Sequence, residues 1–512
     1  MEKLDILNGF EKYDWPVNID RTIEKNGDEY DVIIVGSGIA GLACATLLSK
    51  KGFRVLLLEH HDRAGGFAGS FLRKGFMFNN GLEEISGIWE SGPITCLAKE
   101  AGLDTADYFV LHKAAGIQYK TSEDDLTVPD NLEDLVSMLA EMFPDEGENL
   151  VAFMEDAEKA QDEYYRYADT YNVAMTPELV AKALGIAEEQ YRQENPHIYD
   201  WLSCSVEKKF NEYFKNSELI DMLTMLMIYH GTDLDVTPAH TLLRSYGYFR
   251  NGNYYSKGGA QRFVNALRKF IKRQGVEVLF NHKVDEIVVR DNRVAGVRAA
   301  GKTFNSPVVV SSAHACNTYL QLVDGAHLEE QFIRYIQELE IPYSLLMVFL
   351  GVDMDLSDYP AIIHNHTQDG GYMTLIASNT DPKSAPAGKA NVVLFQLCAY
   401  DDFPQRSSQT YLEKKKAASD ALIAKAEKQI PGLRDHIVVE DAATPQTLER
   451  YNFTPGGTGE GLEDTINNVK PCFKSPIQGL YQVGNSVFPG SGMELAATSG
   501  MICANDICNW GV

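Results

Sequence analysis

Residues 31–59, DVIIVGSGIAGLACATLLSKKGFRVLLLE, constrain the fold of this chain more than any other stretch. A short apolar, β-branched run leads into Gly36, Gly38 and Gly41 at Gly-x-Gly-x-x-Gly spacing, helix formers follow, and a second apolar run ends at Glu59. Continuous apolar runs are typical of strands in a parallel sheet covered on both faces. The stretch therefore predicts one strand, phosphate-binding turn, helix and second strand in succession.

Each residue type in this unit suits a dinucleotide. The first glycine permits a tight turn, the second lets the backbone approach a pyrophosphate, and the third lets the helix pack closely on the strand. The start of the helix adds N–H donors and positive dipole, and an acidic residue after the second strand accepts hydrogen bonds from ribose hydroxyls. We assign these contacts to Gly36, Gly38, Ile39, Ala40, Gly41 and Glu59.

The next residues, HHDRAGGFAGSF, carry a family resemblance. They extend the unit with His60, Arg63, Gly65 and Gly66 in the way that flavoproteins of the amine oxidase and phytoene desaturase superfamily extend theirs. The resemblance implies FAD rather than a nicotinamide as the cofactor, and it adds these four residues to the predicted cofactor site.

Composition and charge limit the class of protein. A chain of 512 residues fits two interleaved domains. The net charge of −26 argues against nucleic acid as a partner and is most simply a solvated acidic surface. Eight scattered cysteines without zinc spacing predict free thiols and no metal site, so we expect a cytoplasmic protein. A peripheral membrane contact through a local apolar patch stays open.

Residues 78–87 resemble a segment of retinol saturases and plant carotenoid isomerases, which in those proteins lines the flavin ring. The shared pattern Phe-x-x-Gly-x-x-x-Ile-x-Gly falls on Phe78, Gly81, Ile85 and Gly87. Two residues depart from the usual pattern: Asn79 replaces a common Asp, and Glu83 stands where saturases often carry His. Because of these two departures, the resemblance does not identify the substrate.

A second signature lies near the C-terminus, in residues 479–500, GLYQVGNSVFPGSGMELAATSG. A strand reaches a turn at Gly484 and Asn485, and a helix is predicted to begin near Gly492 and Met493. The superfamily places this helix N-terminus against the flavin pyrimidine, where its dipole stabilises negative charge. The resemblance also implies that the backbone of Val284 holds the adenine.

The predicted fold class is α/β, with a Rossmann-like FAD-binding domain interleaved with an α+β substrate domain that carries a helical insertion. The predicted segments are an N-terminal extension without a readable motif (1–30), three parts of the FAD-binding domain (31–125, 252–335 and 463–512), a helical cap (126–251) and the substrate domain (336–462).

Periodicity predicts the main elements of these segments. We expect helices at 262–273 and 411–429, an amphipathic helix with Leu135 and Leu139 on its apolar face, and strands at 276–280, 284–289, 294–299, 308–311, 344–352, 392–399 and 480–483. The Met-rich run at 219–231 is apolar nearly all round, which predicts a helix buried on most sides. Core packing is the favoured role of this run, although it is compatible with a substrate wall. His364 and His366 are assigned to a surface loop rather than to a metal site.

Three glutamates are candidates for proton transfer. Glu83 and Glu84 follow the flavin-lining resemblance, and Glu494 lies just after the start of the last helix. Burial raises the pKa of a carboxyl, so each could serve as a general acid. Because adjacent side chains of an extended segment face opposite sides, we expect only one of the first two to face the flavin. His230 and His240 are assigned to the core or the surface.

The resemblance implies an FAD-dependent oxidoreductase acting on C=C bonds of an apolar polyene or unsaturated lipid, with saturase or desaturase chemistry ranked slightly above isomerisation. Two alternatives stay open: a flavin amine oxidase, and a non-catalytic prenyl- or lipid-binding carrier of the same fold. The predicted partners are a hydrophobic small molecule and an external electron donor or acceptor of unknown identity.

Overall fold

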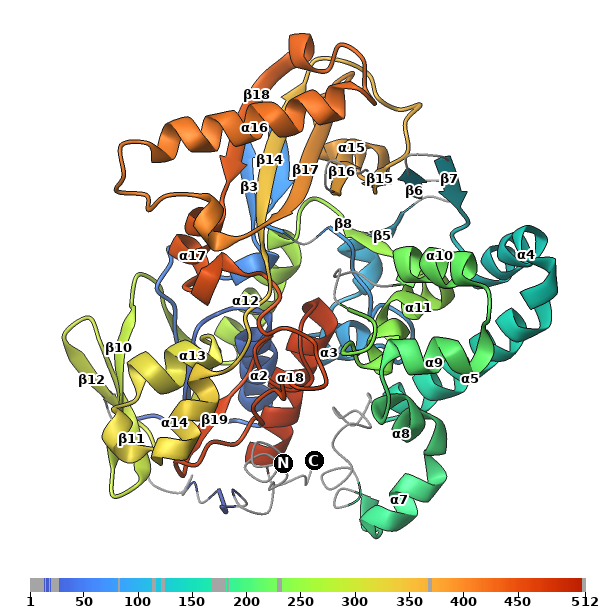
Figure 1. Cartoon of the computed structure of the whole chain (residues 1–512). Helices are drawn as coiled ribbons and strands as arrows, with labels where there is room; N and C mark the ends of the chain where they lie inside the picture. The colour runs from blue at the N-terminus through green and yellow to red at the C-terminus, as the bar shows by residue number, and fades with distance from the viewer. Residues whose placement is uncertain are drawn as a thin grey trace.

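A computed structural model describes residues 13, 15–17, 19, 27–81, 83–112, 117–120, 125–167, 181, 184–227, 233–366 and 371–508. Most of the predicted N-terminal extension, and His230, lie outside the described residues. Two sheets and a helical cap organise the chain (Figure 1).

The nucleotide-binding domain is built on a parallel sheet of five strands in the order β19-β13-β1-β2-β9. Its strands are β1 (Val32–Val35), β2 (Val55–Leu58), β9 (Glu277–Leu279), β13 (Val309–Ser311) and β19 (Leu480–Gln482). Three of these strands come from distant parts of the sequence, so the domain is assembled from separate segments of the chain. This arrangement confirms the predicted Rossmann-like α/β class.

Both faces of this sheet are covered, which explains why its strands are apolar at every position. One face packs on α2 (Ile39–Lys50), α3 (Pro93–Glu100), α12 (Gln261–Arg273) and α18 (Met493–Ile507). The other face packs on α13 (Ala315–Asn317), α14 (Glu330–Gln337) and an antiparallel sheet of β10 (Val284–Arg290), β11 (Arg293–Ala299) and β12 (Lys302–Asn305).

The second domain is a mixed sheet of seven strands in the order β18-β14-β17-β16-β15-β6-β7. These are β18 (Ile437–Ala443), β14 (Ser344–Val352), β17 (Ala390–Cys398), β16 (Tyr372–Ile376), β15 (Ile362–Asn365), β6 (Ile117–Lys120) and β7 (Asp125–Val128). The strands β6 and β7, of which β7 begins at residue 125, thus pair within this sheet. Side chains alternate across the sheet, and one face packs on α16 (Tyr411–Glu427), which lies across the top of Figure 1.

Short elements link the two domains. They are the hairpin β3 (Ser70–Arg73) and β4 (Phe76–Asn79), the pair β5 (Phe109–Leu111) and β8 (Tyr254–Ser256), and the helices α15 (Ala377–Thr380) and α17 (Pro445–Asn452).

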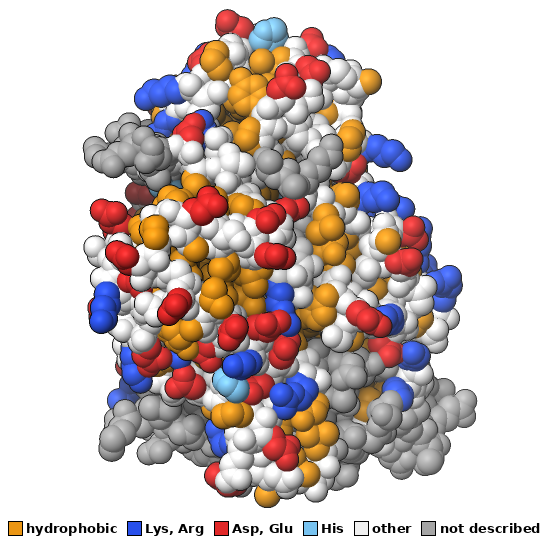
Figure 2. Space-filling view, turned by 90° about the vertical axis from the view of Figure 1, so that its right-hand side faces the viewer, with side chains coloured by type: hydrophobic (Ala, Val, Ile, Leu, Met, Phe, Trp, Pro, Cys, Tyr) orange, Lys and Arg blue, Asp and Glu red, His pale blue; other side chains and the backbone are white. Residues whose placement is uncertain are grey.

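The helical cap has its own core, on the right-hand side of Figure 1. It contains α4 (Leu132–Met142), α5 (Gly147–Tyr165), α7 (Glu188–Glu194), α8 (Pro196–Leu202), α9 (Val206–Tyr213), α10 (Ser217–Met227) and α11 (Leu242–Asn251). Leu135 and Leu139 are buried as predicted. On the face shown in Figure 2, acidic, basic and apolar side chains are interspersed.

Most predicted elements coincide with observed ones to within a residue or two, whereas several observed strands, among them β12, β15, β16 and β18, were not predicted. The expectation for the Met-rich run is wrong in one respect. Helix α10 ends at Met227 within the described residues, and it is buried along one face, at Leu219, Leu223, Leu226 and Met227, rather than nearly all round. The half-buried Met225 and the buried Leu226 line the central cavity, so the helix serves both as core and as cavity wall.

The eight cysteines are all free thiols, as predicted. Within the described ranges, no group of three metal-ligating side chains is close enough to hold an ion. In the same part of the chain, no helix has the length and apolar character needed to cross a bilayer.

Candidate functional site

The glycine turn after β1 is shaped by close contacts on one side and open space on the other. A Cβ atom on Gly41 would lie 2.2 Å from the carbonyl oxygen of Gly36, so only glycine lets α2 pack on the turn. A Cβ on Gly38 would meet nothing nearer than the Ser312 hydroxyl at 3.8 Å. The N-terminus of α2 therefore presents bare backbone, with Ile39 and Ala40, to the cavity.

Glu59 lies at the end of β2, buried, with both carboxylate oxygens hydrogen-bonded. Its Oε2 accepts from the backbone N–H and the hydroxyl of Ser37, at 2.9 and 2.6 Å. Its Oε1 lies 2.9 Å from both the His61 N–H and the His60 ring Nδ1. Burial alone would raise the pKa of Glu59, but the bonds from His60 and Ser37 outweigh it and lower the pKa to about 2. The carboxylate is thus held ionised as a hydrogen-bond acceptor at the end of β2.

The second glycine turn lies directly against the first. Gly65 forms a bridge with Gly38, its N–H donates to the Ser37 carbonyl at 3.0 Å, and its φ of +131° is a conformation that favours glycine. Gly66 has a φ of +55°, and a Cβ there would lie 3.6 Å from the Gly38 Cα. The predicted extension of the motif is therefore part of the same groove.

The remaining predicted cofactor residues line the same cavity. His60 is partly exposed and its Nε2 lies 2.9 Å from the Tyr451 carbonyl oxygen, whereas the exposed Arg63 pairs with Asp62. Val284, the first residue of β10, also lines the cavity.

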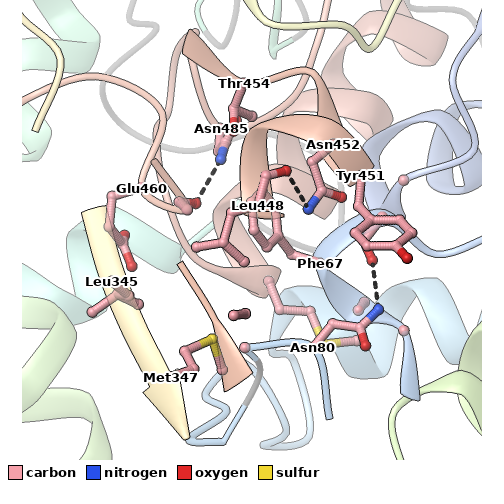
Figure 3. A pocket seen from close by; sticks show the side chains of 18 of the residues that line it. Phe67, Asn80, Leu345, Met347, Leu448, Tyr451, Asn452, Thr454, Glu460 and Asn485 are labelled. Atoms are coloured by element: carbon pink, nitrogen blue, oxygen red, sulfur yellow. Dashed lines mark hydrogen bonds between the residues drawn. The ribbon is translucent and has the colours of Figure 1, made fainter. Parts of the chain in front are cut away.

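The C-terminal signature closes the groove from the other side. Gly484 has a φ of +114°, and its N–H donates to the Ser499 hydroxyl at 2.9 Å. The Asn485 side chain donates to the Gly459 carbonyl at 2.8 Å, as Figure 3 shows. Gly492 caps α18 with a φ of +98°, and a Cβ there would meet no atom within 4 Å. With Met493, the start of α18 opens onto the cavity, as predicted for a helix that faces the flavin.

One continuous cavity of about 1670 Å³ joins this groove to the seven-stranded sheet. Its floor consists of alternate residues of β14, β16 and β17: Leu345, Met347, Phe349, Met373, Phe395 and Leu397. Figure 3 shows Leu345 and Met347 of β14 with Phe67 and Leu448 around the same space. The strands predicted around 344–352 and 392–399 thus form part of the cavity floor, and their role in a substrate domain stays a prediction. Sites for one drug-sized ligand occupy roughly 300–1,000 Å³, so the cavity has room for a dinucleotide and a second, apolar molecule.

The residues present fit FAD. Open space faces the positions Gly38 and Gly492, where bare backbone can approach a ligand, and the ionised Glu59 stands at the end of β2. Gly41 is the exception among the predicted contacts, because it does not line the cavity and supports the turn from behind.

Glu83 and Glu84 both line the cavity, and which of them faces the flavin stays a prediction. The segment bends here instead of running as a strand, which removes the alternation of side chains. Glu83 Oε2 accepts from the Asn79 amide at 3.3 Å, and Glu84 Oε1 accepts from Asn253. Glu83 Oε1 and Glu84 Oε2 are buried without a hydrogen-bond partner among the described residues.

The protonation of this carboxyl pair follows from its burial. Loss of solvation raises the pKa of Glu83 to about 8 and that of Glu84 to about 7. Near neutral pH, Glu83 is therefore mostly protonated and Glu84 about half protonated. The hydrogen bonds of Asn79 give a reason for one departure from the family pattern. Its Oδ1 accepts from the Ser70 hydroxyl and from the Ala260 N–H, so its amide N–H₂ points to Glu83 and donates to it.

Glu494 occupies a different environment. In the first turn of α18 it is buried, its Oε2 accepts from the Ser86 hydroxyl, and its Oε1 accepts from the Tyr165 hydroxyl at 2.8 Å. Burial raises its pKa. Since both oxygens are engaged, Glu494 ties α18 to the flavin-lining segment and to helix α5 of the cap.

The surface-loop assignment of His364 is wrong. His364 lies on β15 and lines the cavity, with its ring stacked on Tyr119 of β6 at 4.6 Å between centroids. Burial lowers the pKa of His364 to about 3, so the ring is neutral. His366 is exposed at the end of the same run. The cavity lining also includes His366 and, from residues 78–87, Asn80, Gly81 and 83–86, but not Phe78, Asn79 or Gly87. It does not include His240, which is consistent with the assignment of His240 to the core or surface.

Sequence reasoning missed several lining residues. Ser312 follows β13 at the carboxyl edge of the parallel sheet, a position that the general rule for such sheets would have indicated. Arg244 and Tyr248 of α11 and Tyr119 of β6 carry no motif, because only the packing of the cap and the mixed sheet brings them to the cavity.

Comparison with known proteins agrees with this geometry. The family model for flavin containing amine oxidoreductases matches residues 39–508. The chain belongs to this family. It is an oxidoreductase, and FAD is its cofactor.

Individual relatives cover nearly the whole chain. The chloroplastic prolycopene isomerase 1 of an Oncidium hybrid cultivar is 27% identical over 94% of this chain and 84% of its own length. The all-trans-retinol 13,14-reductase of Danio rerio is 24% identical, over 94% and 86%. A putrescine oxidase structure has a TM-score of 0.63 at 15% identity and covers 94% of this chain and 99% of its own, a likeness that concerns the fold alone.

Proposed function

We propose that this chain reduces or forms C=C bonds of an apolar polyene, with reduction favoured. The observation that carries the proposal is the cavity itself: an apolar sheet floor shares one space with the dinucleotide groove and with two carboxyls that are mostly or about half protonated near neutral pH. The relatives named for prolycopene and all-trans-retinol support this class of substrate.

FAD, when bound, supplies hydride transfer. The floor residues would hold the polyene flat against the sheet and keep water out. The Glu84 carboxyl would donate its proton to one alkene carbon while hydride reaches the other, so that one C=C bond becomes a C–C single bond with two new C–H bonds. The resulting carboxylate regains a proton from solvent, and an external donor restores the two electrons. In the reverse direction, the carboxylate would accept the proton.

The same carboxyls argue against an amine substrate. A site for an ammonium group would present ionised carboxylates, whereas burial raises the pKa of Glu83 to about 8 and that of Glu84 to about 7, so that at pH 7 Glu83 is mostly and Glu84 about half protonated. Glu494 is occupied by two hydroxyl donors. We therefore rank amine oxidation below polyene chemistry, and we rank the flavin-free carrier lower still because the groove fits FAD.

Entry of the substrate is part of the proposal. Tyr343 and Leu397 line the cavity and are 68% and 51% exposed, so they would form an apolar mouth. A cytoplasmic protein with such a mouth could take a polyene from a membrane surface without crossing it. Co-sedimentation with neutral phospholipid vesicles should fall when Tyr343 and Leu397 are both replaced by Ser, and equal co-sedimentation of the two proteins would refute this route.

The experiment that tests the function is a substrate panel. Oxidised and dithionite-reduced holoprotein are incubated without oxygen with all-trans-retinol, lycopene, an unsaturated fatty acid and putrescine, and the products are analysed by mass. We expect a polyene to gain two hydrogens with reduced protein. An unchanged mass with altered retention would mean isomerisation, and conversion of putrescine alone would refute the proposal.

A further inference from the structure

The central cavity has two unlike walls. The floor residues named above are apolar, although Gln396 and His364 also line the sheet side, whereas the cap side carries several polar and charged groups beside Met225 and Leu226. The polar wall comes from α10, α11 and the loop at 459–463, and its residues are Asp221, Thr224, Arg244, Tyr248, Glu460 and Glu463. A pure hydrocarbon offers these polar side chains no hydrogen-bonding partner.

Arg244 is the cation of this polar wall. Its side chain is 18% exposed, and its guanidinium makes only long contacts: Nη2 to Asp464 Oδ2 at 3.3 Å and Nη1 to the Ser491 carbonyl at 3.5 Å. A guanidinium has about five N–H donors. Most of them are therefore without an acceptor in the part of the chain that the structure describes.

A bound ligand that excludes water from these donors must replace the lost hydrogen bonds, because burying an unpaired polar group is costly. A carboxylate ligand would pair with Arg244 but would also meet the acidic side chains Asp221, Glu460 and Glu463 on the same wall. A hydroxyl suits both kinds of neighbour, since its oxygen accepts from a guanidinium while its O–H donates to a carboxylate.

We infer that Arg244 anchors a terminal hydroxyl of the substrate, so that the enzyme prefers a polyene alcohol to the corresponding hydrocarbon or acid. This inference rests on the proposed function for the identity of the chain and concerns the wall beside the start of α18, where Arg244 contacts Ser491. Arg244 acts in binding and takes no part in proton transfer.

Matched ligand pairs test the inference. Binding of all-trans-retinol, of axerophthene, which has hydrogen in place of the hydroxyl, and of all-trans-retinoic acid is measured by titration of the oxidised holoprotein, with β-carotene and zeaxanthin as a longer pair. A hydrogen bond to a charged group corresponds to about tenfold or more in affinity. We expect the alcohol of at least one pair to bind about tenfold more tightly than its hydrocarbon, and retinol to bind more tightly than retinoic acid.

Variants then identify the residue. In Arg244→Gln the preference should disappear, and in Arg244→Lys it should be partly retained. Arg298→Gln removes an exposed arginine that pairs with Glu286 away from the cavity, and it should leave the preference unchanged. Flavin absorbance shows whether each variant keeps its cofactor.

The outcomes separate the two proposals. Equal binding of alcohol and hydrocarbon by the wild type in both pairs, or an alcohol preference that Arg244→Gln keeps, would overturn the anchor even if polyenes are reduced. An alcohol preference lost in Arg244→Gln, with no polyene converted, would support the anchor and refute the proposed function.

Discussion

Replacing Glu84 by Gln removes a proton that the proposed reduction needs while it preserves the size of the side chain. Burial raises the pKa of Glu84 from 4.5 to about 7, so the carboxyl is half protonated near neutral pH. At one pH unit above its pKa, about a tenth of the molecules keep the proton. The wild-type rate of polyene reduction should therefore fall about tenfold per pH unit above pH 7, because the protonated form is the active one.

The size of the effect follows from the role. General acid catalysis contributes roughly 10²- to 10⁴-fold to a rate, so we expect the Glu84→Gln variant to lose at least about 100-fold in the rate of C=C reduction. It should also lose the alkaline limb of the pH profile. Glu83→Gln is the matched comparison, since the pKa of Glu83 is raised to about 8 and its Oε2 is held by Asn79.

The assay is anaerobic single-turnover reduction by pre-reduced holoprotein, measured from pH 5 to 9, with flavin content determined for each variant. If Glu84→Gln keeps both the wild-type rate and the alkaline limb, Glu84 is not the acid. If Glu83→Gln shows the loss instead, the proton comes from Glu83, and the assignment within the pair must be exchanged.

Further predictions concern the groove, the floor and the helix start. Gly41→Ala should lower the melting temperature of the apoprotein, because the new Cβ would clash with backbone. Gly38→Ala should keep this melting temperature but weaken FAD binding in a fluorescence titration. If the two variants had the same melting temperature and the same FAD affinity, this distinction would be contradicted. The pKa of Glu59 is lower in the folded protein, so the ionised carboxylate stabilises the fold above pH 4.5, and this stabilisation is lost as the pH falls towards 2. In Glu59→Gln, the free energy of unfolding should therefore change less between pH 4.5 and 2 than in the wild type. Met347→Gln should weaken polyene binding while FAD affinity is unchanged, and loss of FAD would argue against a floor role. Glu494→Gln should keep most of the reduction rate but lower the melting temperature, because it weakens the hydrogen bonds from Ser86 and Tyr165. A loss of reduction rate as large as that of Glu84→Gln would show that Glu494 is catalytic.

The nucleotide half of the site could be predicted from sequence because its constraints are local. The glycines at 36, 38 and 41 and the acidic residue at 59 act within one β-α-β unit, where spacing alone determines geometry. The C-terminal signature was equally readable, since a glycine turn and the start of a helix are local features.

The substrate half depended on packing between distant segments. The stacking of His364 on Tyr119 requires β15 and β6 to pair across more than two hundred residues, which no local pattern reveals. The bend at 83–84 removes the alternation of side chains that the sequence predicted for an extended segment. Arg244 has no sequence signal of its own, because it reaches the cavity only through the packing of α11 against the loop before α18.

The central claim is that one cavity couples the flavin to a polyene, and a single-turnover titration tests it most directly. Holoprotein reduced without oxygen is mixed with all-trans-retinol or lycopene, and flavin reoxidation and polyene bleaching are followed in the same sample. We predict that for one of these polyenes each equivalent of flavin reoxidised is matched by one C=C bond lost. Flavin that stays reduced with both polyenes, while neither loses a C=C bond, would contradict the account.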